Sequence, residues 1–368
     1  MSASASASGG GLSDLSTLAG ELVPGGSVLR TVQVAYLMQR KQRLHDVRSD
    51  ATIHEVLHRL QREGLVSLPV YLNDEQVEGW GGNRFYVGGK TYVGIVSVLD
   101  IASFVLGGRR MSTTELAARL RNDLDEPILH VVGSTEESLS LWIAPRAIDV
   151  LSAMHQFAGG VHRALVVPDW EGGAANDATG ADAKMLTQTD IVDYVVHRAA
   201  SASLSALFEK TPRDLGLAEP RELLTVTKSS DLVDALSEMV RFAVHAVPVV
   251  DAETGAVVDT LSVTDLRGST VEHLPAMHSS TVGAFLEQRQ HRAGGTLRPQ
   301  VAFEPHQKLG DVAKGMLRWR VHRAWLVDDE GRPTGVVSFT DVIRTVYDNE
   351  PHACGASSHE EDNAAPPA

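Results

Sequence analysis

At four expected strand-to-helix junctions the sequence carries one short motif, Ser or Thr with Asp three residues later. Each copy ends a β-prone apolar run, and mostly helix-like sequence follows it. A carboxylate can accept hydrogen bonds from two neighbouring hydroxyls at once, and the cis-diol of ribose offers such a pair. The motif therefore predicts four ribose-binding carboxylates, each with a nearby hydroxyl: Ser97 with Asp100, Thr187 with Asp190, Ser262 with Asp265, and Ser338 with Asp341.

The motif also has an ordinary structural interpretation. At a strand-to-helix junction Asp is a favoured N-cap, because its carboxylate accepts the free amides of the first helical turn. A cap could equally be Ser, Thr or Asn, whereas Asp stands in all four copies. The hydroxyl residues could be ordinary side chains at a strand edge. Both interpretations remain open for the hydroxyls, and the recurrence of Asp favours ligand binding.

A second recurrent feature lies before each buried strand. It reads His162-Arg163, His245-Ala246 and His322-Arg323, with Val66-Ser67 at the equivalent place in the first copy. A single His-Arg pair is normally solvated surface. Recurrence at one position favours a phosphate site, because guanidinium offers a planar fork and imidazole adds another donor. We therefore expect phosphate contacts from His162, Arg163, His245, His322 and Arg323.

The surrounding pattern predicts the elements that position these residues. Apolar residues at helical spacing precede each motif within residues 53–60, 147–154, 232–239 and 309–316. A strand-like apolar run follows each of them, and a turn leads to the strand that carries the motif. Each unit therefore reads β-α-β-β-α, which gives an α+β fold made of four tandem repeats.

The repeats account for most of the chain. They cover residues 32–106, 126–200, 218–273 and 296–348. The flanking segments 1–31 and 349–368 are small or polar, and we expect them to be disordered. The first two repeats carry insertions that begin at Asn73 and Asp169, which we expect to form surface loops because hairpin tips tolerate added length.

Composition excludes several classes of protein. A formal charge of −14 opposes nucleic-acid binding, and no apolar run of about 18 residues is present to span a membrane. The single cysteine, Cys354, has no disulfide partner, and no signal sequence opens the chain. An intracellular protein, cytoplasmic or nuclear, is expected. The single cysteine also excludes a multi-cysteine metal site, and no metal site is expected.

These repeats resemble CBS domains, and four in a row resemble the γ regulatory subunit of the AMP-activated protein kinase family. The segment VHRAWLVDDEGRPTGVVSFTDVI resembles a near-consensus final repeat. The segments SLSLWIAPRAIDVLSAM, KMLTQTDI and SVTDLRG are similar to the plant γ-like branch of that family. The resemblance extends from about Val32 to Tyr347.

The resemblance implies an architecture and a function. Repeats 1 and 2, and repeats 3 and 4, would pair into two pseudo-symmetric modules that form a disk. AMP, ADP or ATP would bind as regulatory ligands, with the motif aspartates on ribose and the His and Arg residues on phosphate, and no catalytic cofactor is implied. The partners would be the catalytic and scaffold subunits of a Ser/Thr protein kinase complex. Because Val66-Ser67 and Ala246 depart from the basic pattern, some clefts are expected to bind weakly or not at all.

Two other classes compete with this regulatory subunit. A scaffold or adaptor that keeps the fold but has lost nucleotide sensing would explain the missing basic residues in repeats 1 and 3. An enzyme is not expected, because the segments outside the repeats are short. The sequence also has no nucleophile elbow, phosphate loop or kinase motif set.

Overall fold

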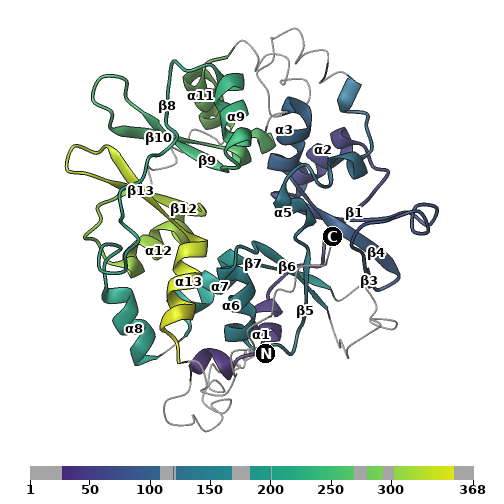
Figure 1. The fold of residues 1–368 in the computed structure, drawn as a ribbon, viewed down its shortest axis with the longest axis horizontal. Coiled ribbons are helices and arrows are strands. Elements are labelled where there is room, and N and C mark those ends of the chain that lie inside the picture. Colours follow the sequence, from purple (N-terminus) through teal and green to yellow (C-terminus); the bar gives the residue numbers. More distant parts are fainter. Residues whose placement is uncertain are drawn as a thin grey trace, which may run out of the picture.

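Four small sheets with their helices surround a common centre, as the ribbon in Figure 1 shows. The computed structural model describes residues 27–107, 119, 122–167, 183–199, 201–268, 280–292 and 302–351. Around the ring the repeats follow the order first, second, fourth, third (Figure 1). No helix in these ranges is long and apolar enough to cross a membrane.

The first two repeats have the expected order of elements. The first consists of β1 (Val47–Arg48), α2 (Ile53–Glu63), β2 (Ser67–Tyr71), β3 (Phe85–Val87), β4 (Lys90–Ser97) and α3 (Val98–Leu106). The second consists of β5 (Trp142–Pro145), α6 (Val150–Ala158), β6 (Arg163–Val167), β7 (Lys184–Thr187) and α7 (Gln188–His197).

The last two repeats follow the same order with one difference. The third consists of β8 (Val226–Thr227), α9 (Leu232–Arg241), β9 (Ala246–Val250), β10 (Val257–Ser262) and η4 (Val263–Gly268). The fourth consists of β11 (Ala302–Phe303), α12 (Leu309–Trp319), β12 (Arg323–Val327), β13 (Pro333–Ser338) and α13 (Phe339–Asn349). The element after the third motif is a 3-10 helix, whereas the other three motifs begin α-helices.

Each sheet is built by the same pairing. The first strand of the repeat runs parallel to the second, and the second runs antiparallel to the strand that carries the motif. A parallel pair needs a crossover connection, which the first helix of each repeat provides, while the antiparallel pair needs only a turn. The β-α-β-β-α order expected from the sequence is therefore the order in the second and fourth repeats, while the first adds β3 and the third ends in the 3-10 helix η4.

The first helix of each repeat begins close to where the apolar periodicity begins. In α2 the apolar residues Ile53, Val56 and Leu60 are fully buried. Thr52 caps the helix in a capping box with Glu55, and Gly64 ends it in the left-handed conformation. Local signals and core packing thus agree on the limits of this helix.

The repeats contact one another in two ways. Sheet residues of the first and second repeats share one buried cluster, and those of the third and fourth share another. Helical residues instead join the first repeat to the third and the second to the fourth. The sheets therefore form the two expected modules, and the helices hold the modules together. Arg344 of α13 adds a polar contact, since its Nη2 donates to the carbonyl of Ala158 at 2.8 Å.

The remaining helices lie before, between and within the repeats. They are η1 (Val28–Arg30), α1 (Val34–Met38), η2 (Ile128–Val131), α5 (Glu136–Leu139), α8 (Ala202–Glu209) and α11 (Val282–Arg292).

Two expectations about the flanking and inserted segments need correction. Residues 27–31 were expected to be disordered, but η1 forms there and Leu29 is fully buried in the core of the second and fourth repeats. The insertion at Asn73 is more than a surface loop, because it supplies β3, which pairs with β4 and buries Val87. Residues 1–26, 168–182 and 352–368 lie outside the described residues, and with them most of the expected disordered ends and of the second insertion.

Candidate functional site

The strand register brings the two recurrent features of the sequence together. Within the sheets, Arg163 is paired with Thr187, and Arg323 with Ser338. Ala246 with Ser262, and Ser67 with Ser97, occupy the same places in the other repeats. In the second and fourth repeats, the arginine expected to contact phosphate is thus the direct cross-strand neighbour of the hydroxyl residue that starts the motif.

A backbone hydrogen bond links the histidine to the motif in three repeats. The amide of Phe339 donates to the carbonyl of His322 at 3.0 Å, and the amide of Val263 donates to that of His245 at 2.9 Å. Gln188 makes the same contact with His162 at 3.4 Å. The histidine is therefore held beside the start of the helix that carries the aspartate.

The hydroxyl residue, and not the aspartate, is the helix N-cap. Ser97, Thr187 and Ser338 are the caps of α3, α7 and α13, and each aspartate stands at the third helical position in a capping box. Asp341 Oδ2, for example, accepts the Ser338 amide at 2.7 Å and the Ser338 hydroxyl at 2.6 Å. The motif does cap the helix, as the structural interpretation of the sequence suggested, but Ser or Thr is the cap and Asp completes the capping box. In Asp341 this role uses only one carboxylate oxygen, Oδ2.

The four aspartates differ in what else they contact. Asp100 is buried, and its Oδ1 accepts a hydrogen bond from the hydroxyl of Thr135. Burial raises the pKa of Asp100 despite these hydrogen bonds. Asp190 lies 2.8 Å from Lys41 Nζ. Asp265 is buried and accepts the amide of Ser262 at 2.9 Å.

Asp341 has a carboxylate oxygen available to a ligand. Its hydrogen bonds to the described residues all involve Ser338, through Oδ2 and through its own amide. The positive charge of Arg323 lies close enough for the two side chains to influence each other electrostatically. Asp190 also makes its contacts through Oδ2 alone, but one of them is the ion pair with Lys41, whereas no ion pair to Asp341 is present among the described residues. Asp341 is therefore the motif aspartate best placed to accept two ribose hydroxyls.

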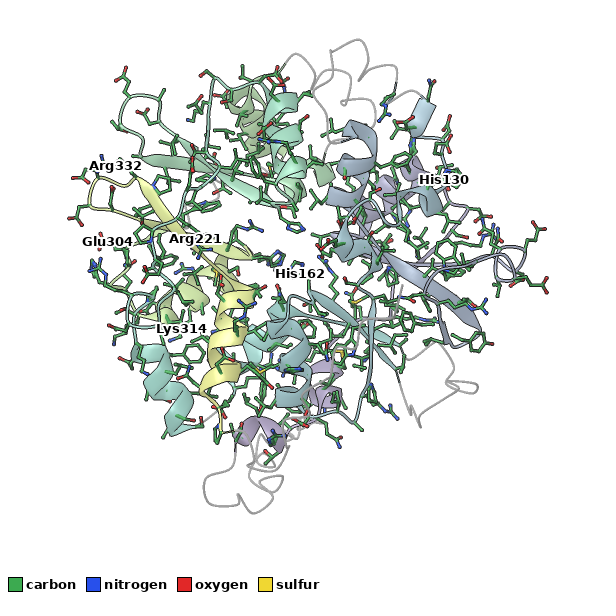
Figure 2. The ribbon with its side chains drawn as sticks, viewed as in Figure 1. His130, His162, Arg221, Glu304, Lys314 and Arg332 are labelled. Carbon is green, nitrogen blue, oxygen red and sulfur yellow. The ribbon has the colours of Figure 1, made fainter. Side chains whose placement is uncertain are left out.

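The basic residues of three repeats converge near the centre of the ring. Figure 2 shows His162 pointing toward that centre, whereas His130, Lys314, Glu304 and Arg332 lie toward the periphery. The rings of His162 and His245 are in edge contact, with centroids 5.7 Å apart. The guanidinium of Arg323 also reaches the third repeat, where Nη1 lies 3.4 Å from the Ala246 carbonyl.

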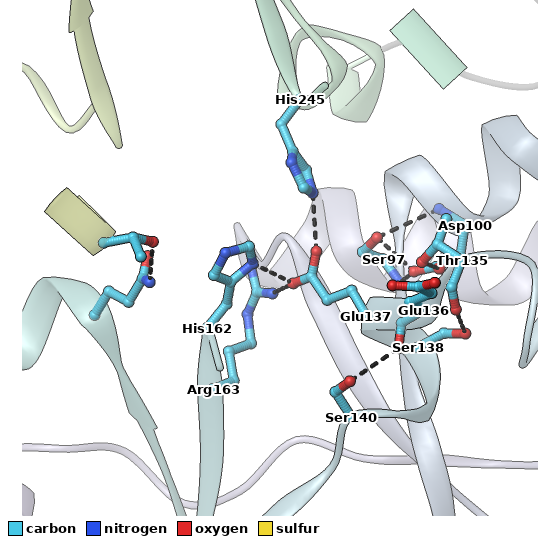
Figure 3. Close-up of polar contacts among 12 residues, drawn as sticks. Ser97, Asp100, Thr135, Glu136, Glu137, Ser138, Ser140, His162, Arg163 and His245 are labelled. Carbon is cyan, nitrogen blue, oxygen red and sulfur yellow. Dashed lines mark hydrogen bonds and ion pairs between the residues drawn. The ribbon is translucent and has the colours of Figure 1, made fainter. Parts of the chain in front are cut away.

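A carboxylate that the sequence did not indicate lies among these residues. Glu137 Oε1 is 2.7 Å from Arg163 Nη1 and 3.0 Å from His162 Nδ1, and Oε2 is 2.9 Å from His245 Nε2 (Figure 3). Glu137 lies on α5, just before β5, the first strand of the second repeat. Because it belongs to neither of the two recurrent features, recurrence could not identify it.

This arrangement shifts the pKa values of three side chains at the centre. Burial raises the pKa of Glu137, but hydrogen bonds from His162 and His245 and the charge of Arg163 hold it well below its usual range. Desolvation, together with the charges of Arg163 and Arg323, lowers the pKa of His322 to about 4. Burial lowers the pKa of Arg323 to about 10, with Asp341 acting in the opposite direction. Positive charge is therefore concentrated here, and an anion would be stabilised.

Comparisons with known proteins agree with this arrangement. The CBS domain family model matches residues 220–271 and 296–348. A solved structure from Methanocaldococcus jannaschii, described as a candidate archaeal homologue of g-AMPK, superposes with a TM-score of 0.61 at 20% identity. The match covers 86% of this chain and all of that one. The fold is therefore the CBS-domain fold, with four repeats.

Sequence relatives include regulatory subunits of protein kinases. The Arabidopsis thaliana SNF1-related protein kinase regulatory subunit gamma-like PV42a is 26% identical over 87% of this chain and 96% of its own length. Human 5'-AMP-activated protein kinase subunit gamma-3 is 35% identical over 37% of this chain and 27% of its own length. The resemblance to plant γ-like proteins that the motifs indicated is confirmed by these relatives.

Proposed function

We propose that this protein is a non-catalytic regulatory subunit that binds adenine nucleotides at the centre of the ring and signals their level to a Ser/Thr protein kinase. The observation that carries the proposal is the convergence of His162, His245, His322 and two arginines on one place. The names of the relatives support the kinase connection, because they are regulatory or γ subunits of protein kinases. A kinase partner also implies an intracellular location, cytoplasmic or nuclear.

The fourth repeat supplies the best single nucleotide position. Arg323 and Ser338 are cross-strand neighbours, and Asp341 follows one helical turn later. A phosphate at Arg323 and His322 would leave the ribose beside the available oxygen of Asp341. Guanidinium and phosphate form charge-assisted hydrogen bonds, and the carboxylate accepts from the diol. The four repeats, over residues 32–106, 126–200, 218–273 and 296–348, are the proposed structural units.

Signalling would follow from differential affinity. A nucleotide that binds one arrangement of the two modules more tightly than another shifts the population toward it, and a bound kinase would detect the shift. The helical contacts between the first and third repeats and between the second and fourth join the two modules, so we infer that such a ligand would bias these contacts.

Calorimetry with AMP on the purified protein tests the proposal. We expect micromolar binding that Arg323→Ala weakens roughly 10- to 100-fold, since a hydrogen bond to a charged group contributes about 1.5–3 kcal/mol. Arg320→Ala is the matched control, because Arg320 is an exposed arginine three residues away. Absence of binding at millimolar AMP, ADP and ATP would refute the proposal.

A scaffold that lacks nucleotide sensing is the second candidate, and Glu137 favours it by neutralising part of the basic centre. The two candidates differ in a pull-down with a kinase. A scaffold captures the same amount with or without AMP, whereas the proposed sensor changes the amount captured or the kinase activity.

A further inference from the structure

The segment that precedes β5 in the second repeat contacts both kinds of residue expected to bind a nucleotide. Thr135 donates its hydroxyl hydrogen to Asp100, the motif aspartate of the first repeat. Two residues later, the Glu137 carboxylate contacts Arg163, His162 and His245. One short segment therefore places a hydroxyl on the expected ribose residue and an anion on the expected phosphate residues.

We propose that the α5 segment, residues 133–140, is an internal ligand that occupies the places of a ribose hydroxyl and a phosphate. An adenine nucleotide that uses Asp100 and Arg163 must first displace this segment. The inference rests on the proposed nucleotide-binding function and adds its regulation. The nucleotide position at Asp341 and Arg323 does not share these contacts, so it binds without this competition.

The pattern of contacts is that of an anion among donors. The two histidines use different oxygens of Glu137, and Arg163 shares Oε1 with His162. Glu137, His162 and His245 also lie close enough together to hold a metal ion. A cation there would lie beside Arg163, which is unfavourable. An external phosphate, by contrast, offers the same donors a similar set of oxygens.

The packing of α5 is close but limited in extent. A methyl group on Gly94 of β4 would lie 2.5 Å from the Ser138 carbonyl and 2.9 Å from Val132 Cγ1, so glycine is required for this approach. The Ser138 hydroxyl donates to the Thr135 carbonyl at 2.8 Å and accepts from the Gly133 amide at 2.7 Å. Leu139 is 54% exposed. A helix of four residues with its leucine in solvent loses little apolar burial when it leaves β4.

The cost of displacement sets the apparent affinity. When only a fraction of molecules has the segment displaced, the apparent dissociation constant is the intrinsic one divided by that fraction. Removing Glu137 removes its competition and leaves Arg163 and two histidines unpaired. Both effects increase affinity for a phosphate group.

The direct test compares Glu137→Ala with Glu136→Ala by calorimetry with AMP and with pyrophosphate. The two glutamates are adjacent on α5, but Glu136 is exposed and Glu137 is only partly exposed. Figure 3 shows both residues and the contacts of the Glu137 carboxylate. We expect Glu137→Ala to bind at least roughly 10-fold tighter or to bind an additional molecule, and Glu136→Ala to match the unmodified protein. Binding by Glu137→Ala that equals or falls below that of the unmodified protein would overturn the inference.

Two further measurements test the inference even if Glu137→Ala fails to fold. Gly94→Ala forces α5 away from β4, so this variant is also expected to bind AMP and pyrophosphate more tightly than the unmodified protein. In the unmodified protein, saturating AMP or pyrophosphate is expected to speed hydrogen exchange in residues 133–140. If exchange there stays unchanged while the ligand is bound, the segment is not displaced and the inference fails.

The outcomes also separate this inference from the proposed function. AMP binding that depends on Arg323 but not on Glu137 would uphold the function and refute the internal ligand. Pyrophosphate binding that tightens in Glu137→Ala, without binding of any adenine nucleotide, would uphold the internal ligand and refute the function. Micromolar zinc binding that is lost in Glu137→Ala would identify a metal site and overturn the inference.

Discussion

Arg163 Nη1 and Glu137 Oε1 lie 2.7 Å apart, which joins β6 of the second repeat to the segment that precedes β5. The ion pair is largely shielded from solvent, with the side chains 15% and 19% exposed. Arg163 was expected to contact phosphate, and here its partner is a carboxylate of the same chain. Glu137 therefore neutralises part of the positive charge of the second repeat, whereas Arg323 of the fourth repeat remains available beside Asp341.

Asp341→Asn is predicted to separate ribose binding from helix capping. The asparagine oxygen still accepts the Ser338 amide, so we expect the free energy of unfolding to fall by no more than about 1 kcal/mol. The lost carboxylate is expected to weaken AMP binding roughly 10-fold or more, as calorimetry would show. Unchanged affinity would remove Asp341 from the proposed site.

Ala243→Gly is predicted to stabilise the fold. Ala243 has a φ of 51°, in the left-handed region where a side chain costs about 1–2 kcal/mol. Glycine relieves that strain but loses more entropy on folding, so we expect a net gain of about 0.5–1 kcal/mol in chemical denaturation. The control, Ala206→Gly in the exposed part of α8, is expected to destabilise by about 1 kcal/mol. Equal effects of the two substitutions would contradict the assignment of strain.

Ser237→Ala is also predicted to stabilise the fold. The Ser237 hydroxyl is buried in α9, and no hydrogen-bond partner is present among the described residues. Removing it relieves an unsatisfied polar group and improves helix propensity, for a gain of about 1 kcal/mol in the free energy of unfolding. Ser138→Ala, at an equally buried serine with two hydrogen bonds, should destabilise instead. A loss of stability in both variants would show that Ser237 has a partner.

His322 is predicted to make the fold less stable in mild acid. Its pKa is about 4 in the folded protein against the ordinary value of 6.5, and the cationic or titratable groups around it are Arg163, Arg323, His162 and His245. As pH falls from 6.5 toward 4, the unfolded chain takes up a proton that the folded protein resists, so stability decreases. His322→Gln is expected to reduce that decrease in denaturation curves measured between pH 7.5 and 5. An identical pH dependence in both proteins would exclude His322 as its source.

Local signals predicted most of each repeat. Periodicity placed the starts of α9 at Leu232 and α12 at Leu309. It succeeds because each helix buries its apolar residues on one side, in a buried cluster of its own. The motif located the hydroxyl and aspartate pairs correctly, although it assigned the cap to the wrong member. Recurrence is informative here because each repeat must satisfy the same strand register.

Contacts between repeats could not be predicted in the same way. Periodicity shows that α3 has an apolar face but not that the third repeat covers it. Glu137 and Thr135 belong to neither recurrent feature. The partners of Glu137 lie 25 to 108 residues away in sequence, and the partner of Thr135 lies 35 residues away. Only folding brings them together, so no spacing rule could identify the occupied centre.

The central claim is that the basic centre binds an adenine nucleotide, and a crystal structure with AMP tests it most directly. We predict AMP density with its phosphate within hydrogen-bond distance of Arg323 and His322 and its ribose on Asp341. A centre without nucleotide density at saturating AMP, or AMP bound away from these residues, would contradict the account.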